Sequence, residues 1–256
     1  MSQRFAYRRR LLASLFACVF ATAAQAQTPE GHYRFGPNVP AGAVGHERLN
    51  RGGPVHGYFQ PVEVTAPRGV VVSLAEQGYW TDATDGPVLA GMLIGQVYRV
   101  KLSNLEDHPD RDLYPTIEVI DRTYPPPGME RRFPIPIVLN ASDLDLALRG
   151  LMVTRVVYVE DPALAIPGKQ MPGEQLWHDA GPQANALEEA DRLGRPVAIV
   201  RIGGRVPVEG DGPDWEFLYG SPPWRHLTRP TTLAAPSTTI VPTEKTARSD
   251  RNAARR

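Results

Sequence analysis

The chain has 256 residues, of which 42% are hydrophobic, and its 28 Lys and Arg are matched by 28 Asp and Glu. The hydrophobic fraction excludes a wholly disordered chain, and the 26 Pro argue against long helices and a coiled coil. The formal net charge of zero argues against a nucleic-acid-binding protein, which needs excess basic residues to neutralise phosphates.

Residues 1–26 have the features of a secretory signal peptide. Arginines at residues 4 and 8–10 give a basic start, residues 11–24 are mostly apolar, and residues 24–26 (Ala-Gln-Ala) form a cleavage pattern. The apolar stretch is shorter than the roughly 20 residues that span a bilayer. We therefore expect a periplasmic or secreted protein with no transmembrane span after cleavage.

Two variants of export remain open beside this simple one. Residues 8–12 (RRRLL) resemble a twin-arginine signal, which exports folded proteins. Cys18 follows Leu-Phe-Ala, a pattern similar to a bacterial lipobox, so lipid anchoring through Cys18 is the second variant. Because Cys18 is the single cysteine, cleavage after Ala26 excludes disulfides, Cys-based zinc sites and thiol nucleophiles in the mature chain.

The mature chain divides into three parts. Residues 27–54 lack an apolar period and are expected to form a flexible lead-in, and residues 229–256 a disordered basic tail rich in Thr, Pro and Ala. Between them, short apolar runs separated by Pro and Gly predict an Ig-like or related β-sandwich over residues 55–228. The expected strands are residues 62–65, 70–75, 92–102, 117–120, 133–139, 151–159 and 197–202.

Three of these strands carry more specific predictions. Alternation over residues 98–102 places Arg99 on the face opposite Tyr98 and Val100. Prolines within residues 133–139 cannot donate to a ladder, so this strand is expected at a sheet edge or paired through a bulge. Residues 151–159 are apolar on both faces apart from Thr154 and Arg155, which predicts a central strand.

Two short helices are expected to interrupt the strands. Ser142 and Asp145 resemble a capping box, and Gly150 would end that helix. A second helix beginning near Pro182 has its apolar residues on one face and ends at Gly194. After the last strand, residues 211–224 are aromatic and turn-rich, which predicts an ordered arm against the sandwich.

One acidic loop has the residue types of a calcium site. Oxygen ligands on a loop suit Ca²⁺, the only cofactor that the sequence suggests, but the glycine and the distal glutamate of an EF-hand are missing. A solvated hairpin loop is the alternative interpretation. The candidate ligands lie around His108 and are Glu106, Asp107, Asp110 and Asp112.

Two other groups of residues suggest binding or catalysis. Four tryptophans would form a sugar-stacking platform if at least two lay exposed on one surface, or else would cover the core: Trp80, Trp177, Trp215 and Trp224. His178 and Asp179 would supply a base and an orienting acid. Neighbours on an extended chain point apart, so Asp179 as a helix cap beside an exposed His178 is the alternative.

Four segments carry a family resemblance: residues 57–64 (GYFQPVEV), 113–121 (LYPTIEVID), 124–128 (YPPPG) and 154–160 (TRVVYVE). They resemble exported proteins of planctomycete-type bacteria, a family without an assigned reaction, over about residues 55–205. The resemblance implies a bacterial envelope setting and no catalytic residues.

These observations favour an exported protein of the bacterial envelope with a structural or protein-interaction role, bound to an envelope protein or polysaccharide. A carbohydrate-binding module is the first alternative. A hydrolase that uses the acidic loops or His178 is the second, and it would require two of Glu106, Asp110, Asp112 and His178 to lie in one cleft. The chain lacks G-x-S-x-G, H-E-x-x-H, P-loop and G-x-G-x-x-G motifs, which argues against an enzyme. The neutral charge is also uneven, since residues 27–228 hold 18 basic against 26 acidic residues.

Overall fold

The computed structural model describes residues 36, 38–165, 168–169, 175–181, 184–208, 210 and 212–230. The predicted signal peptide, Cys18, Pro182 and residues 231–256 of the predicted tail lie outside the described residues. Within the described part, the chain is mostly β, with two sheets and three short α-helices, in agreement with the predicted class.

The two sheets differ in size. The smaller sheet has the order β11 (Trp224–His226), β5 (Val88–Leu93), β1 (Phe59–Thr65) and β8 (Ile135–Val138). Strands β1 and β8 run parallel, whereas β1 and β5 are antiparallel. The larger sheet has the order β3 (Tyr79–Trp80), β2 (Val71–Glu76), β6 (Val97–Ser103), β7 (Thr116–Val119), β10 (Gly194–Ile202) and β9 (Val153–Glu160), with β4 (Thr84–Asp85) beside β2.

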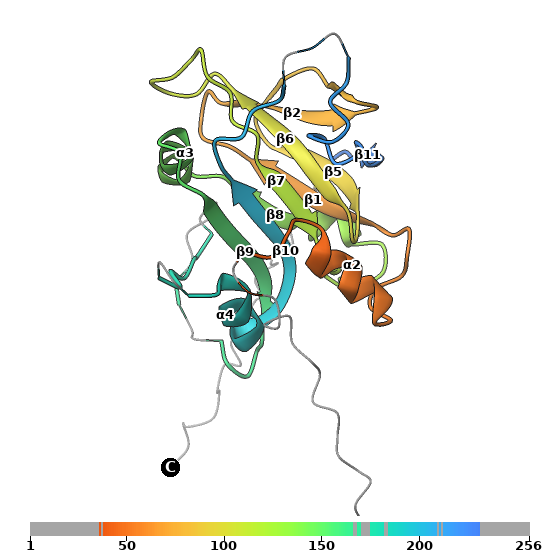
Figure 1. Cartoon of the computed structure of the whole chain (residues 1–256). Coiled ribbons are helices and arrows are strands. Elements are labelled where there is room, and N and C mark those ends of the chain that lie inside the picture. Colours follow the sequence, from red (N-terminus) through yellow and green to blue (C-terminus); the bar gives the residue numbers. More distant parts are fainter. Residues whose placement is uncertain are drawn as a thin grey trace, which may run out of the picture.

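The apolar faces of both sheets share one core, which makes the fold a sandwich (Figure 1). Buried Val62 and Ile135 come from the smaller sheet, and Val100 and Val200 from the larger. A turn over residues 66–69 carries the chain from β1 in one sheet to β2 in the other, and the Val70 amide donates to the Pro67 carbonyl at 3.0 Å. Expected strand 92–102 is divided between β5 and β6 by a turn at Gly95, whose φ is +82°.

Both predicted helices are present, but their caps differ from the prediction. In α3 (Ala141–Leu148) the N-cap is Asn140, whose Oδ1 accepts from the Asp143 amide at 2.8 Å, and not Ser142. Ser142 lies inside the first turn and donates to the same Asn140 oxygen. The second helix, α4 (Ala186–Leu193), begins after its N-cap Asn185 and is followed by Gly194.

A third helix, α2 (Ala43–Asn50), lies within the expected lead-in, and a short 3₁₀ helix (Glu130–Arg132) precedes β8. Val44 of α2 and Leu187 of α4 pack with Ile120 and Ile199 of the larger sheet, so both helices cover its outer face. In Figure 1, α2 is orange and α4 teal. These four residues therefore form a second, smaller core between the two helices and the outer face of the larger sheet.

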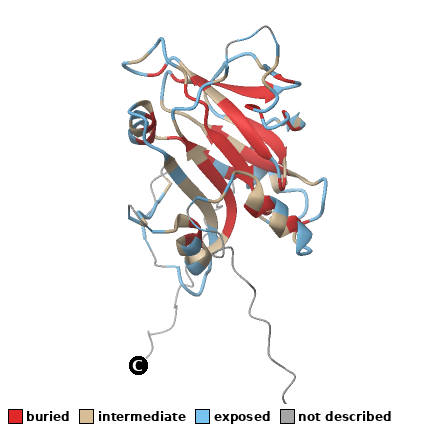
Figure 2. Ribbon diagram, in the orientation of Figure 1, coloured by how far each residue is buried: buried red, intermediate tan, exposed pale blue. Residues whose placement is uncertain are grey.

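The two predictions about strand position have opposite outcomes. Strand β8 is at a sheet edge, as its prolines predict. The prediction of a central position for residues 151–159 is wrong, because β9 is the edge strand next to β10. In Figure 2 the strands beside it are largely buried, whereas β9 is half-buried or exposed. Val157 of β9 contacts the main core, and Val156 contacts the core beneath α4. Both faces of a strand can therefore be apolar even when the strand has a hydrogen-bonded neighbour on one side only.

The aromatic C-terminal arm is ordered over residues 212–223 and packs against β6. Arg99 is only 6% exposed, and its guanidinium donates from Nε to the Phe217 carbonyl at 3.1 Å and from Nη1 to the Tyr114 carbonyl at 2.8 Å. The same guanidinium lies 4.2 Å from the centre of the Phe217 ring. The face of β6 opposite Tyr98 is therefore covered by the arm, which Arg99 holds in place.

Candidate functional site

A cavity with a volume of about 740 Å³ lies beside the edge strand β9. Its walls come from β9, the start of α3, the helix α4 and the segment 175–181. Gln175 fixes one end of this segment by donating from Nε2 to the Pro136 carbonyl of β8 at 3.3 Å. We call this cavity the β9 groove and define it by Asn140, Asp143, Arg155, Trp177, His178 and Glu189.

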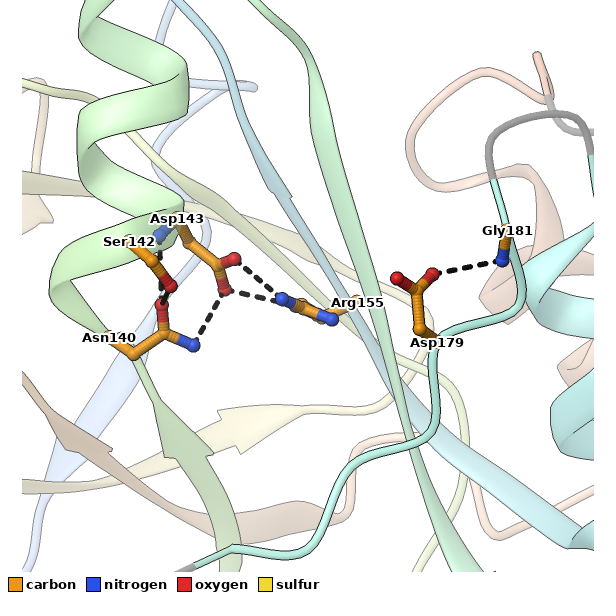
Figure 3. A network of polar contacts seen from close by, with 6 residues as sticks. All are labelled: Asn140, Ser142, Asp143, Arg155, Asp179 and Gly181. Carbon is orange, nitrogen blue, oxygen red and sulfur yellow. Dashed lines mark hydrogen bonds and ion pairs between the residues drawn. The ribbon is translucent and has the colours of Figure 1, made fainter.

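One wall of the β9 groove is a fixed polar network (Figure 3). The Asp143 carboxylate, which is almost fully buried, accepts from Arg155 Nε at 2.9 Å and from Arg155 Nη2 at 2.6 Å. It also accepts from Asn140 Nδ2 at 3.0 Å. The Arg155 guanidinium lies 4.1 Å from the centre of the Trp177 ring, a cation–π contact. The guanidinium is thus held between a carboxylate and an indole.

The opposite wall is formed by α4 and carries an acid–imidazole contact. His178 Nε2 lies 3.5 Å from Glu189 Oε1. Burial and the charges of Glu160 and Glu189 raise the pKa of the Tyr158 phenol, so this side chain stays neutral and able to donate a hydrogen bond. The groove therefore offers hydrogen-bonding groups around one exposed aromatic ring.

A comparison with protein-family models, curated proteins and solved structures finds no match to this chain. Any function therefore has to follow from the contacts of its own residues. Among the described residues, no helix is long and apolar enough to cross a bilayer.

Asp179 has neither of its two predicted roles, although His178 is exposed, as the second hypothesis expects. Its Oδ1 accepts from the Gly181 amide at 2.9 Å, in a local turn, and His178 pairs with Glu189 instead. Asp179 also does not cap the following helix, because α4 begins at Ala186 with Asn185 as its N-cap. A neighbour in sequence was the wrong partner for His178, since the chain folds it toward α4.

The four predicted tryptophans do not share one surface. Trp177, 62% exposed, stands in the β9 groove at one edge of the larger sheet. Trp215, 49% exposed, lies against Gly78 in the turn between β2 and β3 at the opposite edge. Trp80 and Trp224 are half-buried there: Trp80 packs 5.7 Å from the Tyr114 ring, and Trp224 Nε1 donates to the Ala75 carbonyl at 3.1 Å. The two exposed tryptophans, Trp177 and Trp215, therefore lie at opposite edges of the larger sheet.

The acidic loop between β6 and β7 does not assemble a metal site. Among the residues that the structure describes, no three His, Cys, Asp or Glu side chains are placed to hold a metal ion. Asp112 instead pairs with Lys101, whose Nζ lies 3.0 Å from its Oδ2, while Glu106, Asp107 and Asp110 are exposed. None of Glu106, Asp110 and Asp112 is among the described residues that line the β9 groove, so none of these acids joins His178 there.

Asp112→Asn should reduce stability at neutral pH but not in acid. Burial raises the pKa of Asp112, but hydrogen bonds from Ser103 and Lys101 and the Lys101 charge outweigh burial and lower it overall. A carboxyl with a lowered native pKa stabilises the fold above its unfolded pKa and loses this contribution as the pH falls through the native value. Urea unfolding at pH 7 should show a loss of about 0.5–1 kcal/mol for Asp112→Asn. The matched variant Asp110→Asn should show none, and equal losses at both positions would contradict the assignment.

Sequence reasoning missed Asp143 and Arg155 as site residues. They lie 12 positions apart, and only the turn that follows α3 brings them together. One signal was available, because Arg155 interrupts an otherwise apolar strand and a charge there needs a partner.

Proposed function

We propose that the chain is an exported protein of the bacterial envelope that acts by binding, in a structural or protein-interaction role, through the β9 groove. Export is supported by the basic start, the apolar stretch and the cleavage pattern of residues 1–26. The envelope setting is supported by the resemblance of residues 55–205 to exported bacterial proteins. The groove supplies the contact surface.

The observation that carries this proposal is the fixed wall of Asp143, Arg155 and Trp177. Arg155 makes two parallel hydrogen bonds to one carboxylate and stacks on the indole, so the three side chains hold one another in place. Trp177 is nevertheless 62% exposed. An exposed aromatic side chain that is already held in position loses little conformational entropy on binding, which is the property of an interface anchor.

A polysaccharide is the second candidate ligand, and the same tryptophan favours it. One face of the Trp177 ring is covered by Arg155 at 4.1 Å, which leaves the other face for the flat apolar side of a sugar ring. Groups that can hydrogen-bond to sugar hydroxyls, the Glu189 carboxylate and the Tyr158 phenol, line the same groove.

Trp177→Ala should weaken binding about 30-fold, the effect of losing an anchor worth about 2 kcal/mol. The experiment is a pull-down from envelope extract, scored separately for proteins and for polysaccharides, followed by titration of the captured species. Trp215→Ala is the matched control, because it removes an exposed indole at the opposite edge of the sheet. Trp177→Phe should restore part of the affinity.

The outcome of this experiment distinguishes the two ligand classes. Trp177-dependent capture of a protein supports the interaction role, and Trp177-dependent capture of a polysaccharide supports the carbohydrate module. Capture that is equal in Trp177→Ala and Trp215→Ala contradicts binding at the β9 groove. Cell fractionation tests the setting independently, since mature protein recovered from the cytoplasm would contradict export.

A further inference from the structure

A second cluster of charged residues lies around Asp121, outside the β9 groove. The Asp121 carboxylate is fully buried, and its Oδ2 lies 3.0 Å from Arg48 Nη2 and 3.0 Å from Arg195 Nη1. Its Oδ1 accepts from the Arg122 amide at 2.7 Å. Arg48 belongs to α2, Arg195 to β10 and Arg122 to the segment after β7, so three separate parts of the chain meet at one carboxylate.

Two tyrosines stack on these arginines. The Arg122 guanidinium lies 3.8 Å from the centre of the Tyr58 ring and 5.1 Å from that of Tyr124. The Arg195 guanidinium lies 5.0 Å from the centre of the same Tyr124 ring. We call Arg48, Asp121, Arg122, Tyr124 and Arg195 the Asp121 cluster.

The charges of the Asp121 cluster do not balance. The cluster holds three guanidinium groups but one buried carboxylate, which pairs with the guanidinium groups of Arg48 and Arg195 and accepts only the backbone amide of Arg122. Of the nearby acids, Glu47 pairs with Arg51, and Glu130 is half-buried and accepts from the Gly128 amide. Backbone hydrogen bonds and, after them, the charge of Arg122 lower the pKa of Glu130, so this carboxylate offsets part of the excess and at least one positive charge remains. The excess stands out because residues 27–228 hold 18 basic against 26 acidic residues.

Two hydrogen-bond donors of the cluster are also unused. Arg48 Nε and Arg122 Nε are both buried, and neither has an acceptor among the described residues. Buried guanidinium donors are normally paired, since an unpaired one loses its hydration without compensation. Their position beside uncompensated charge indicates that an acceptor of negative charge belongs there.

Tyr124 gives an independent indication of a ligand. Its φ is +51°, in the left-handed region that a bulky residue rarely adopts, yet its side chain is more than half exposed. Strained backbone of this kind is concentrated at binding and catalytic sites. The strain holds the Tyr124 ring over Arg122 and Arg195, at the surface of the cluster.

We propose that the Asp121 cluster binds a tetrahedral oxyanion, a phosphate or sulfate group. Guanidinium groups bind such oxyanions through paired hydrogen bonds, and one oxyanion would supply both the negative charge and the acceptors that the buried Nε–H groups of Arg48 and Arg122 lack. The site is separate from the β9 groove, because no member of the cluster is among the described residues that line the groove. The proposal therefore does not depend on the proposed function.

The test is an NMR titration of the ¹⁵N-labelled chain with sodium sulfate and with sodium phosphate, against sodium chloride at equal ionic strength. The Nε–H resonances of Arg48 and Arg122 should shift and saturate with sulfate or phosphate but not with chloride. Arg122→Gln should weaken the affinity about tenfold or more. Arg149→Gln is the matched control, since Arg149 is an exposed arginine on α3 that pairs with Asp145.

Each outcome decides the proposal. Saturable shifts at Arg48 and Arg122 that are lost in Arg122→Gln and kept in Arg149→Gln support it, and the tighter of the two anions identifies a phosphorylated or a sulfated ligand. Shifts no larger than those with chloride, or equal affinity in the two variants, would overturn it. If Arg122→Gln does not fold, the titration of the wild-type chain alone decides, because it reports directly on the two buried Nε atoms.

Discussion

Glu118→Ala is expected to lower the free energy of unfolding by about 3–5 kcal/mol, the usual effect of removing one partner from a buried ion pair. Glu118 is fully buried on β7, and its Oε2 accepts from Arg201 Nη1 at 2.8 Å. Its Oε1 accepts from the Gly45 amide at 2.8 Å, in the first turn of α2. Because the N-cap of α2 makes no side-chain hydrogen bond, the carboxylate of a distant strand acts as its cap.

Urea unfolding of four variants, including Arg201→Leu alone, tests this role of Glu118. Glu118→Gln keeps an acceptor for Gly45 and should lose less stability than Glu118→Ala. The double variant Glu118→Leu/Arg201→Leu removes both charges and should be more stable than Glu118→Ala, since it leaves no buried charge unpaired. If the two residues do not interact, the loss of unfolding free energy in the double variant should equal the loss in Glu118→Ala plus the loss in Arg201→Leu. That result would contradict the proposed pair.

Arg99→Met is expected to release the C-terminal arm, at a cost of about 3 kcal/mol or more from two charged hydrogen bonds and a cation–π contact. Burial lowers the pKa of Arg99, although the nearby Tyr219 opposes this. The guanidinium is therefore poorly hydrated, and its contacts with the protein compensate for the lost water. Methionine replaces the aliphatic stem but leaves the carbonyls of Phe217 and Tyr114 without their donor.

Limited proteolysis measures the release of the arm separately from global unfolding. Arg99→Met should be cut within residues 212–223 under native conditions, while the wild type is resistant. Lys101→Met is the control on the same strand, because Lys101 pairs with Asp112 rather than with the arm. Equal cleavage of the wild type and Arg99→Met would show that Arg99 does not hold the arm.

The strands could be predicted from sequence because, in a half-buried strand, apolar residues that face the core alternate with polar residues that face the solvent. The prolines of β8 also predicted its edge position, because a residue without an amide hydrogen cannot donate to a neighbouring strand. The position of β9 could not be predicted in this way. Its second apolar face is covered by helix α4, and the sequence pattern is the same as that of a strand in the middle of a buried sheet. Helix α2 was missed because its cap is a carboxylate on β7, 73 positions away.

The candidate sites depended even more on distant residues. Trp177 was recognised by its residue type, but its partner Arg155 lies on a strand and the carboxylate that fixes Arg155 on a helix. The Asp121 cluster joins Arg48 and Asp121 across 73 positions, with no local pattern to connect them. Tertiary contacts alone create both sites.

The edge position of β9 connects ligand binding to local stability. A strand hydrogen-bonded on one side only is among the first parts of a sheet to open, and β9 is bonded to β10 alone. Arg155, which holds Trp177, lies on this strand. A ligand in the groove would therefore bind only molecules in which β9 is closed, so its affinity includes the free energy of closing the strand. Amide hydrogen exchange in β9 then becomes a direct measure of how far the groove is formed before any ligand arrives.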